Sequence, residues 1–284
     1  MRQVEAYSRL AGLYDEIVID PCHDRWASFL HELWSADAEG VRSVLDLCCG
    51  TGLLAGELIA RGYAVVGVDA SEAMLALARK RLGPEAGLSR MTLPDLTVEG
   101  FFDAAVSTFD GFNYLTPEEL GLTMAAVAHR LRPAGWLVFD LHTDAMMEFT
   151  IANAVVAGES AGNDFVISSV VDPSARTCDT RIELTRPRDG DPFCEQHRQY
   201  FHTDADVRAS LQDAGFAVTA VSDEYTHQPA DASTLSATWT ARRLPTWSFP
   251  PKSASCSRFQ DGLVRLDRTS STGTSRKSTQ SPTS

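Results

Sequence analysis

Two apolar stretches, each containing an acid near its end, constrain the fold of this chain more than any other feature. The first is Val-Leu-Asp-Leu-Cys-Cys-Gly-Thr-Gly at residues 44–52, and the second is Val-Val-Gly-Val-Asp at residues 65–69. An apolar run that leads into closely spaced glycines predicts a buried parallel strand, a tight turn and a helix N-terminus where a ligand can approach the backbone. Asp69 stands where doubly wound folds place the carboxylate that binds a ribose diol. The pattern therefore predicts a nucleoside site.

The residues around the glycines discriminate between two kinds of nucleoside cofactor. Residues 50–55, Gly-Thr-Gly-Leu-Leu-Ala, satisfy the G-x-G-x-x-G/A pattern of nicotinamide and flavin proteins. A pyrophosphate needs backbone N–H donors without a negative charge nearby, and Asp46 would repel it. S-adenosylmethionine carries a sulfonium and an ammonium but no phosphate, so the same acid would attract it. The electrostatics favour S-adenosylmethionine, and a nicotinamide oxidoreductase remains the weaker alternative.

The chain resembles the class I S-adenosylmethionine-dependent methyltransferases over about residues 5–245. The resemblance rests on the two stretches above and on three later segments, residues 102–115, 131–141 and 214–216. These segments read Phe-Asp-Ala-Ala-Val-Ser-Thr-Phe-Asp-Gly-Phe-Asn-Tyr-Leu, Leu-Arg-Pro-Ala-Gly-Trp-Leu-Val-Phe-Asp-Leu and Ala-Gly-Phe. The resemblance implies a Rossmann-like, doubly wound α/β fold with a mostly parallel sheet and an antiparallel β insertion after the fifth strand. It also implies methyl transfer by direct in-line displacement, with S-adenosylhomocysteine as the product.

Helix-start signals follow several of the expected strands. Ser71 is placed to cap a helix that ends before Gly83, and Thr203 is placed to cap a later one. Residues 116–119, Thr-Pro-Glu-Glu, form a capping box with proline at the first helical position. Alternating strands and helices of this kind are typical of a parallel sheet covered on both faces.

After the strand expected at residues 136–141, the pattern changes. Three β-rich runs at residues 165–171, 178–186 and 193–201 are separated by turn signals and predict an antiparallel meander. Strands near residues 216–223 and 234–243 then complete the main sheet.

These signals divide the chain into three parts. The resemblance implies an N-terminal helical lid over residues 1–40, followed by a methyltransferase domain over residues 41–245. The insertion in that domain, about residues 160–202, would cover the acceptor pocket. Residues 246–284 are rich in Ser, Thr and Pro and bury too little apolar surface to offset chain entropy, which predicts a poorly ordered basic tail.

Charge limits which molecules this protein is expected to bind, and cysteine content indicates its compartment. The tail carries six basic and two acidic side chains, a surplus of four, so the rest of the chain has a formal charge of −17 when the whole has −13. Such an acidic chain repels nucleic acid and anionic membrane, which favours a small-molecule acceptor. The six cysteines form no C-x-x-C pair, and neither an N-terminal signal nor a long apolar span is evident, so we expect a cytoplasmic protein. The sequence leaves a homo-oligomer open.

The resemblance also implies which residues bind the cofactor. The glycines and Asp69 follow from the strand-end pattern, and the others follow from their places in the matching segments. Aromatic faces attract a sulfonium as they attract other cations, which favours Phe109. The full predicted set is Tyr7, Asp46, Cys48, Gly50, Gly52, Asp69, Ala70, Met74, Phe109 and Asp110.

The acceptor side is predicted from the segment after the fourth strand and from the insertion. The expected acceptor contacts are Phe112, Asn113, Tyr114 and Tyr200, and the candidate catalytic groups are His142, Tyr14 and His197. Residues 140–144, Asp-Leu-His-Thr-Asp, also have the composition of a metal cluster, but the three side chains would share one side only on an extended backbone, so we predict no metal. No strong base triad is evident, which favours an amine nitrogen over an oxygen or carbon acceptor.

One position departs from the family pattern. In many relatives an Asp just before Met-Thr binds the adenine amino group, and here Arg90 occupies that position in Ser-Arg-Met-Thr, residues 89–92. Asp95 or backbone groups could take the role instead. The substitution leaves open a protein that binds S-adenosylmethionine without catalysis. Within the family, the segment at residues 109–115 and the insertion most resemble enzymes that modify secondary metabolites, including amino-sugar and antibiotic N-methyltransferases.

Overall fold

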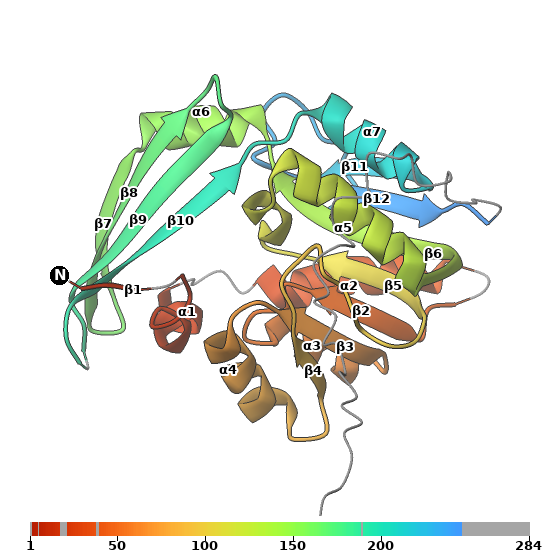
Figure 1. The fold of residues 1–284 in the computed structure, drawn as a ribbon, viewed down its shortest axis with the longest axis horizontal. Coiled ribbons are helices and arrows are strands. Elements are labelled where there is room, and N and C mark those ends of the chain that lie inside the picture. Colours follow the sequence, from red (N-terminus) through yellow and green to blue (C-terminus); the bar gives the residue numbers. More distant parts are fainter. Residues whose placement is uncertain (1, 5, 18–21, 38–39, 189, 246–284) are drawn as a thin grey trace, which may run out of the picture. The chain divides into compact units, whose positions relative to one another are not determined.

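A seven-stranded sheet forms the centre of the structure, a computed structural model that describes residues 2–4, 6–17, 22–37, 40–188 and 190–245 (Figure 1). In spatial order its strands are β11 (Phe216–Asp223), β12 (Ser236–Arg243), β6 (Leu131–His142), β5 (Phe102–Ser107), β2 (Ser43–Leu47), β3 (Ala64–Asp69) and β4 (Gly87–Arg90). β12 pairs antiparallel with both neighbours, and the pairs from β6 to β4 are parallel. The predicted Rossmann-like sheet is confirmed. The tail predicted at residues 246–284 lies outside the described residues.

Helices cover both faces of this sheet. On one face, α2 (Cys22–Ser35) and α3 (Leu53–Ala60) pack Trp34 and neighbouring apolar side chains against Val44 and Val138. On the other face, α7 (Asp204–Asp213) places the Arg208 guanidinium 5.1 Å from the centre of the Trp239 ring in β12. α5 (Pro117–Arg130) packs beside α7, and α4 (Glu72–Leu82) packs beside α3. The carboxyl ends of the parallel strands lie at the same edge of the sheet, between the two layers of helices.

The helix-start signals expected from the sequence are present. The Ser71 hydroxyl accepts a hydrogen bond from the Met74 backbone N–H at 3.2 Å. Thr116 and Glu119 make both hydrogen bonds of a capping box, with Pro117 at the start of α5. Thr203 caps α7 in the same way as Ser71 caps α4. These caps satisfy N–H groups that a helix leaves unpaired, and so they set where each helix begins.

A second sheet is built from the insertion and from one strand at the N-terminus. Its strands, in spatial order, are β1 (Arg2–Val4), β10 (Phe193–Tyr200), β9 (Thr177–Arg186), β8 (Asn163–Asp172) and β7 (Val155–Ser160), and α6 (Asp144–Ala152) leads into it. The predicted antiparallel meander is confirmed as β8, β9 and β10. β7 precedes the start of the insertion predicted at about residue 160. It is exposed along almost its whole length and lacks the alternation by which a strand is predicted from sequence. β1 pairs with β10 in parallel.

The segment expected to form a lid, residues 1–40, divides into two parts. Leu10, just before α1 (Ala11–Ile17), packs against Leu184 and Phe193 of the inserted sheet, and α1 also contacts α4 (Figure 1). α2 instead packs against the central sheet, where its apolar side chains, Trp34 among them, are buried. Of the described part of this segment, α1 and Leu10 pack against α4 and the inserted sheet.

Candidate active site

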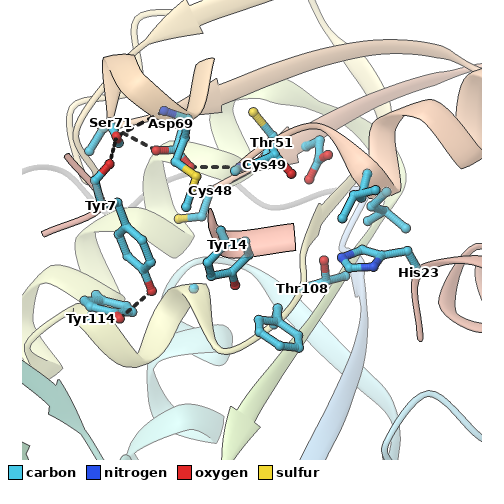
Figure 2. Close-up of a pocket in the computed structure, with 18 of the residues that line it drawn as sticks. Tyr7, Tyr14, His23, Cys48, Cys49, Thr51, Asp69, Ser71, Thr108 and Tyr114 are labelled. Carbon is cyan, nitrogen blue, oxygen red and sulfur yellow. Dashed lines mark hydrogen bonds between the residues drawn. The ribbon is translucent and has the colours of Figure 1, made fainter. Parts of the chain in front are cut away.

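A cavity of about 300 Å³ lies at the carboxyl ends of β2, β3 and β5 (Figure 2). The loops after β2 and β3, with Phe109 after β5, form one wall, which we call the loop wall. Tyr7 and Tyr14 of the N-terminal segment, with Tyr114, form the opposite wall. The residues predicted to bind the cofactor that line the cavity are Tyr7, Asp46, Cys48, Gly50, Asp69, Ala70, Met74 and Phe109. Tyr14 and Tyr114, predicted for the acceptor side, also line it. Sequence reasoning missed His23, Ser71 and Thr108, which line the same cavity.

The glycine turn after β2 has a backbone that few other residues adopt. Gly50 has a φ of 53°, and no atom of the described residues lies within 4 Å of where a side-chain Cβ would be, so the backbone is open on the cavity side. Gly52 has a φ of 77°, and an added Cβ would lie 3.1 Å from the Ala78 Cβ of α4. Gly52 therefore packs α3 against α4 and does not line the cavity, so its predicted cofactor contact stays a prediction.

Asp69 ends β3 with its carboxylate fixed by backbone groups. Its Oδ2 accepts from the Gly50 N–H at 2.9 Å and its Oδ1 accepts from the Ser71 N–H at 2.8 Å (Figure 2). Burial raises the pKa of Asp69, and these two hydrogen bonds act against that rise. The loop thus presents an oriented carboxyl group to the cavity.

Asp46 is a buried acid with one oxygen left unpaired. The residue is 1% exposed, lines the cavity, and its Oδ2 has no hydrogen-bond partner among the described residues. Burial, followed by the charge of Asp69, raises the pKa of Asp46 to about 8. An unpaired buried carboxyl group is costly unless a ligand completes it, and a cation suits it better than a phosphate does. Asp46, Asp69 and the open backbone at Gly50 fit S-adenosylmethionine.

Aromatic hydroxyls close the opposite side of the cavity. The Tyr7 and Tyr114 hydroxyl oxygens are 2.6 Å apart, and the Tyr114 hydroxyl lies 3.1 Å from Nδ1 of His197. The Tyr14 ring packs edge-on against both Tyr7 and Phe109. Burial raises the pKa of Tyr7, Tyr14 and Tyr114, so these groups stay protonated and can donate hydrogen bonds. His197 does not line the cavity and reaches it through Tyr114.

Asp110 and His142 lie behind this wall. Asp110 Oδ2 accepts from the Gln199 side-chain amide and is 3.9 Å from His142 Nε2. Burial raises the pKa of Asp110 to about 7, against the effects of Gln199 and His197, and burial lowers the pKa of His142. Asp110 does not line the donor cavity itself, although Phe109 and Gly111 on either side do. His142 lines a second cavity of about 400 Å³, formed with the start of α7.

Three predicted acceptor contacts are placed elsewhere. Phe112 is fully buried with its ring centre 5.3 Å from that of Phe139, because it fills the core beneath the short helix η1 (Gly111–Tyr114). Asn113 is also fully buried, and its side chain bonds the Tyr200 carbonyl at 2.8 Å and the His142 N–H at 3.1 Å. Tyr200 lines neither cavity. The contacts predicted for Phe112 and Asn113 are therefore corrected to structural roles.

Neither of the residues considered for the adenine contact lines the donor cavity. Arg90 ends β4 with its guanidinium Nε donating to the Ala70 carbonyl at 2.9 Å, so it supports the loop after β3. Asp95 is exposed. Cys48 and Cys49 line the cavity as free thiols, and burial raises the pKa of both, which makes them poor nucleophiles.

Comparison with known proteins agrees with this geometry. Residues 44–135 match the family model described as a methyltransferase domain. A putative methyltransferase of Geobacillus sp. (strain WCH70) is 30% identical over 238 residues, which cover 80% of this chain and 96% of that protein. The chain belongs to the S-adenosylmethionine-dependent methyltransferases. Asp69 and Gly50 line this cavity. We call it the donor cavity, and the roles of its residues in donor binding stay predictions.

Solved structures of methyltransferases share the fold. An S-adenosylmethionine-dependent methyltransferase from Clostridium acetobutylicum ATCC 824 has a TM-score of 0.74 at 21% identity, covering 83% of this chain and 98% of that one. Streptomyces venezuelae DesVI has a TM-score of 0.65 at 26% identity, covering 81% and 97%. A further S. venezuelae relative, dTDP-3-amino-3,4,6-trideoxy-alpha-D-glucopyranose N,N-dimethyltransferase, is 36% identical over 115 residues, or 40% of this chain and 48% of that protein.

Among the residues that the structure describes, no helix combines the length and apolar character needed to cross a membrane. No group of His, Cys, Asp and Glu among them is arranged to hold a metal ion. Asp144, from the segment that has the composition of a metal cluster, pairs with Arg176 at 2.5 Å.

Proposed function

We propose that this methyltransferase methylates an amine nitrogen of a small-molecule acceptor. The observation that carries the proposal is the buried pair of Asp110 and His142, 3.9 Å apart beside the donor cavity. A carboxyl group whose pKa burial raises to about 7 can accept a proton near neutral pH once it is ionised, and an imidazole whose pKa burial lowers stays neutral beside it. An ammonium acceptor must lose one proton before it reacts, and such groups are suited to take it.

Residues of the loop wall would hold the donor. S-adenosylmethionine supplies a methyl group already activated by attachment to a sulfonium. Asp69 would accept hydrogen bonds from the ribose hydroxyls. Asp46, which holds a proton below about pH 8 in the donor-free protein, would release it when the cation binds and would then offset the positive charge of the donor. The ring of Phe109 would lie toward the cation. The backbone at Gly50 and the side chains of Tyr7, Cys48, Ala70 and Met74 would complete the enclosure.

The reaction needs alignment and removal of a proton. One nitrogen–carbon bond forms, and one sulfur–carbon bond breaks with its electron pair going to sulfur, so an ammonium acceptor releases one proton in all. In its ionised form Asp110 would take that proton, and the neutral ring of His142 beside it could carry it toward the second cavity. The aromatic wall of Tyr7, Tyr14 and Tyr114 would exclude water and orient the acceptor. No enzyme nucleophile is required.

Two further observations support an amine of small size. A formal charge of −17 on residues 1–245 favours a cationic acceptor and disfavours nucleic acid. The 36% identical relative is named as an N,N-dimethyltransferase acting on an amino sugar linked to a nucleotide. We therefore propose an amino sugar or a comparable amine of secondary metabolism, with Tyr14, Tyr114 and, through Tyr114, His197 on the acceptor side.

The test is a panel incubation with isotopically labelled methyl donor. Amino sugars, other primary and secondary amines, and the alcohols of matching structure are offered separately, and products are detected by mass spectrometry as the gain of one labelled methyl group. We expect products from amines and none from the alcohols. Methylation of oxygen or carbon with no amine product would overturn the proposal. Calorimetry with S-adenosylmethionine, S-adenosylhomocysteine and NAD(P) on the same protein would show tight binding of the first two alone.

A further inference from the structure

Glu195 is a fully buried carboxylate of the inserted sheet that accepts hydrogen bonds from the N-terminal segment. It lies in β10 and is 0% exposed. Its Oε2 accepts from the Tyr7 N–H at 2.6 Å, and its Oε1 accepts from the Arg9 and Leu10 N–H groups at 2.9 Å each. Three backbone donors from one short segment therefore converge on one side chain. We call this segment, residues 6–10, the N-terminal strap.

The strap is fastened at a second point to the donor site. The Ser71 hydroxyl donates to the Tyr7 carbonyl at 3.0 Å, and the Ser71 N–H donates to Asp69 (Figure 2). Tyr7 has a φ of 55°, a left-handed conformation that a tyrosine adopts only when its surroundings impose it. The backbone of Tyr7 is thus held on both sides. Its N–H donates to Glu195, and its carbonyl accepts from Ser71 in the loop that follows Asp69.

The same carboxylate also lies against the aromatic cluster. Glu195 Oε2 is 3.4 Å from Nε2 of His197, whose Nδ1 contacts the Tyr114 hydroxyl at 3.1 Å. The Tyr7 and His197 ring centres are 4.8 Å apart. Glu195 and His197 are two residues apart on β10, so both side chains point to the same face of the sheet. Glu195 therefore contacts both the strap backbone and the imidazole that supports the tyrosines.

We propose that Glu195 is a positioning residue that holds the N-terminal strap closed over the donor cavity and aligns Tyr7, Tyr114 and His197. The proposal rests on the proposed function of that cavity. Donor binding and strap closure support each other, because Asp69 would contact the donor and reaches Tyr7 through Ser71. Under this linkage a closed strap raises donor affinity, and a bound donor holds the strap closed by the same factor.

The rest of the contact network explains why a change at Glu195 would open the strap without detaching α1. α1 is tied to the glycine turn separately, by Asp15 Oδ1, which accepts from the Thr51 hydroxyl at 2.7 Å. Ser160 also donates to the Glu16 carbonyl at 2.7 Å. Glu195→Ala removes the acceptor of three strap N–H groups, whereas Glu195→Gln keeps one acceptor oxygen. The loss of these hydrogen bonds favours exposure of the strap to water.

The test compares Glu195→Gln and Glu195→Ala with Arg198→Gln, a variant of an exposed residue on the same strand that pairs with Asp179. Calorimetry measures affinity for S-adenosylmethionine, and trypsin cleavage after Arg9 is timed with and without S-adenosylhomocysteine. We expect Glu195→Ala to bind the donor about tenfold more weakly, with Glu195→Gln between it and the wild type. In the wild type and Arg198→Gln the ligand should slow cleavage after Arg9 at least severalfold, and this protection should be lost in Glu195→Ala.

The outcomes separate this proposal from the function on which it rests. Wild-type affinity and wild-type protection of Arg9 in both Glu195 variants would overturn the role of Glu195. If Glu195→Ala does not fold, Glu195→Gln alone decides the matter by the same two measurements. A wild type that binds no S-adenosylmethionine would instead overturn the proposed donor site. Once an acceptor is known, the variants should raise the KM for the donor more than they lower kcat, which a general loss of folded enzyme would not do.

Discussion

The loop wall and the strap side of the donor cavity are assembled over very different distances along the chain. On the loop wall, Gly50 and Asp69 are 19 residues apart and form a direct hydrogen bond. On the strap side, Tyr7 bonds Glu195 across 188 residues, and Tyr114 meets His197 across 83. Local spacing therefore encodes the loop wall, whereas the strap side exists only after the inserted sheet has formed.

The two sides also differ in chemistry. The loop wall presents carboxyl groups and open backbone, which suits a charged donor, and the strap side presents protonated tyrosines and an imidazole. We expect changes on the loop wall to alter donor affinity. Changes near Asp110 and His142, between the cavities, should alter turnover instead.

The largest effect is expected from Asp69→Ala. The carboxylate would accept hydrogen bonds from the ribose and also anchors Gly50 and Ser71, so its loss should weaken donor affinity about 1,000-fold. Calorimetry with S-adenosylhomocysteine measures this. Asp95→Ala is the matched control, since Asp95 is exposed and does not line the cavity. An equal loss of affinity for S-adenosylhomocysteine in the two variants would assign the adenine contact to Asp95 and contradict the assignment of the loop wall.

Asp110→Asn should lower kcat about 100-fold on an amine acceptor while leaving donor affinity within twofold or so. The wild-type rate at subsaturating amine should rise with pH through about 7, because Asp110 must be ionised to take a proton and its pKa is raised to about 7 by burial. Asp110→Asn should flatten that rise. A steep rise that persists in the variant would assign the proton to another group.

His142→Ala should slow turnover about tenfold and leave donor affinity unchanged, since the ring lines the second cavity and reaches the donor cavity only beside Asp110. Steady-state kinetics with a confirmed acceptor measure the effect. The adjacent second-cavity residue Thr143 is a helix cap and is not a suitable control, so exposed Asp179→Asn is preferable. Unchanged turnover in His142→Ala would limit the proton path to Asp110.

The last prediction concerns the stability of the donor-free protein and not catalysis, and it depends on Asp46. The pKa of Asp46 in the folded protein is raised by burial to about 8, above its ordinary value, so the folded state holds a proton that the unfolded state releases between about pH 4 and 8. This contribution to stability is full below about pH 4 and is lost as the pH rises through about 8. We expect the Tm of the donor-free protein to fall more steeply over that range in the wild type than in Asp46→Asn. Parallel curves would show that Asp46 does not titrate as the structure implies.

The residues predicted for the acceptor side lie in different places. Tyr14 and Tyr114 line the donor cavity, whereas His197 lies behind Tyr7 and Tyr114 and does not line it. Phe112 and Asn113 follow the same strand as Phe109, yet they turn inward because the chain forms the short helix η1 there. Sequence spacing does not reveal that turn. A signal for Glu195 was present, since it alternates with His197 on β10, but nothing local indicates the strap to which it bonds.

The sequence was sufficient for the parallel sheet, the helix caps and the loop wall, because strand burial, capping and a glycine turn depend on neighbours within a few tens of residues. Only the tertiary structure decided that β1 joins β10, that α2 belongs to the core, that His142 faces a second cavity and that Glu195 binds the strap. These features depend on contacts between segments more than a hundred residues apart, or on which face a side chain takes after packing. Burial and long-range hydrogen bonding, which local pattern does not specify, fix them.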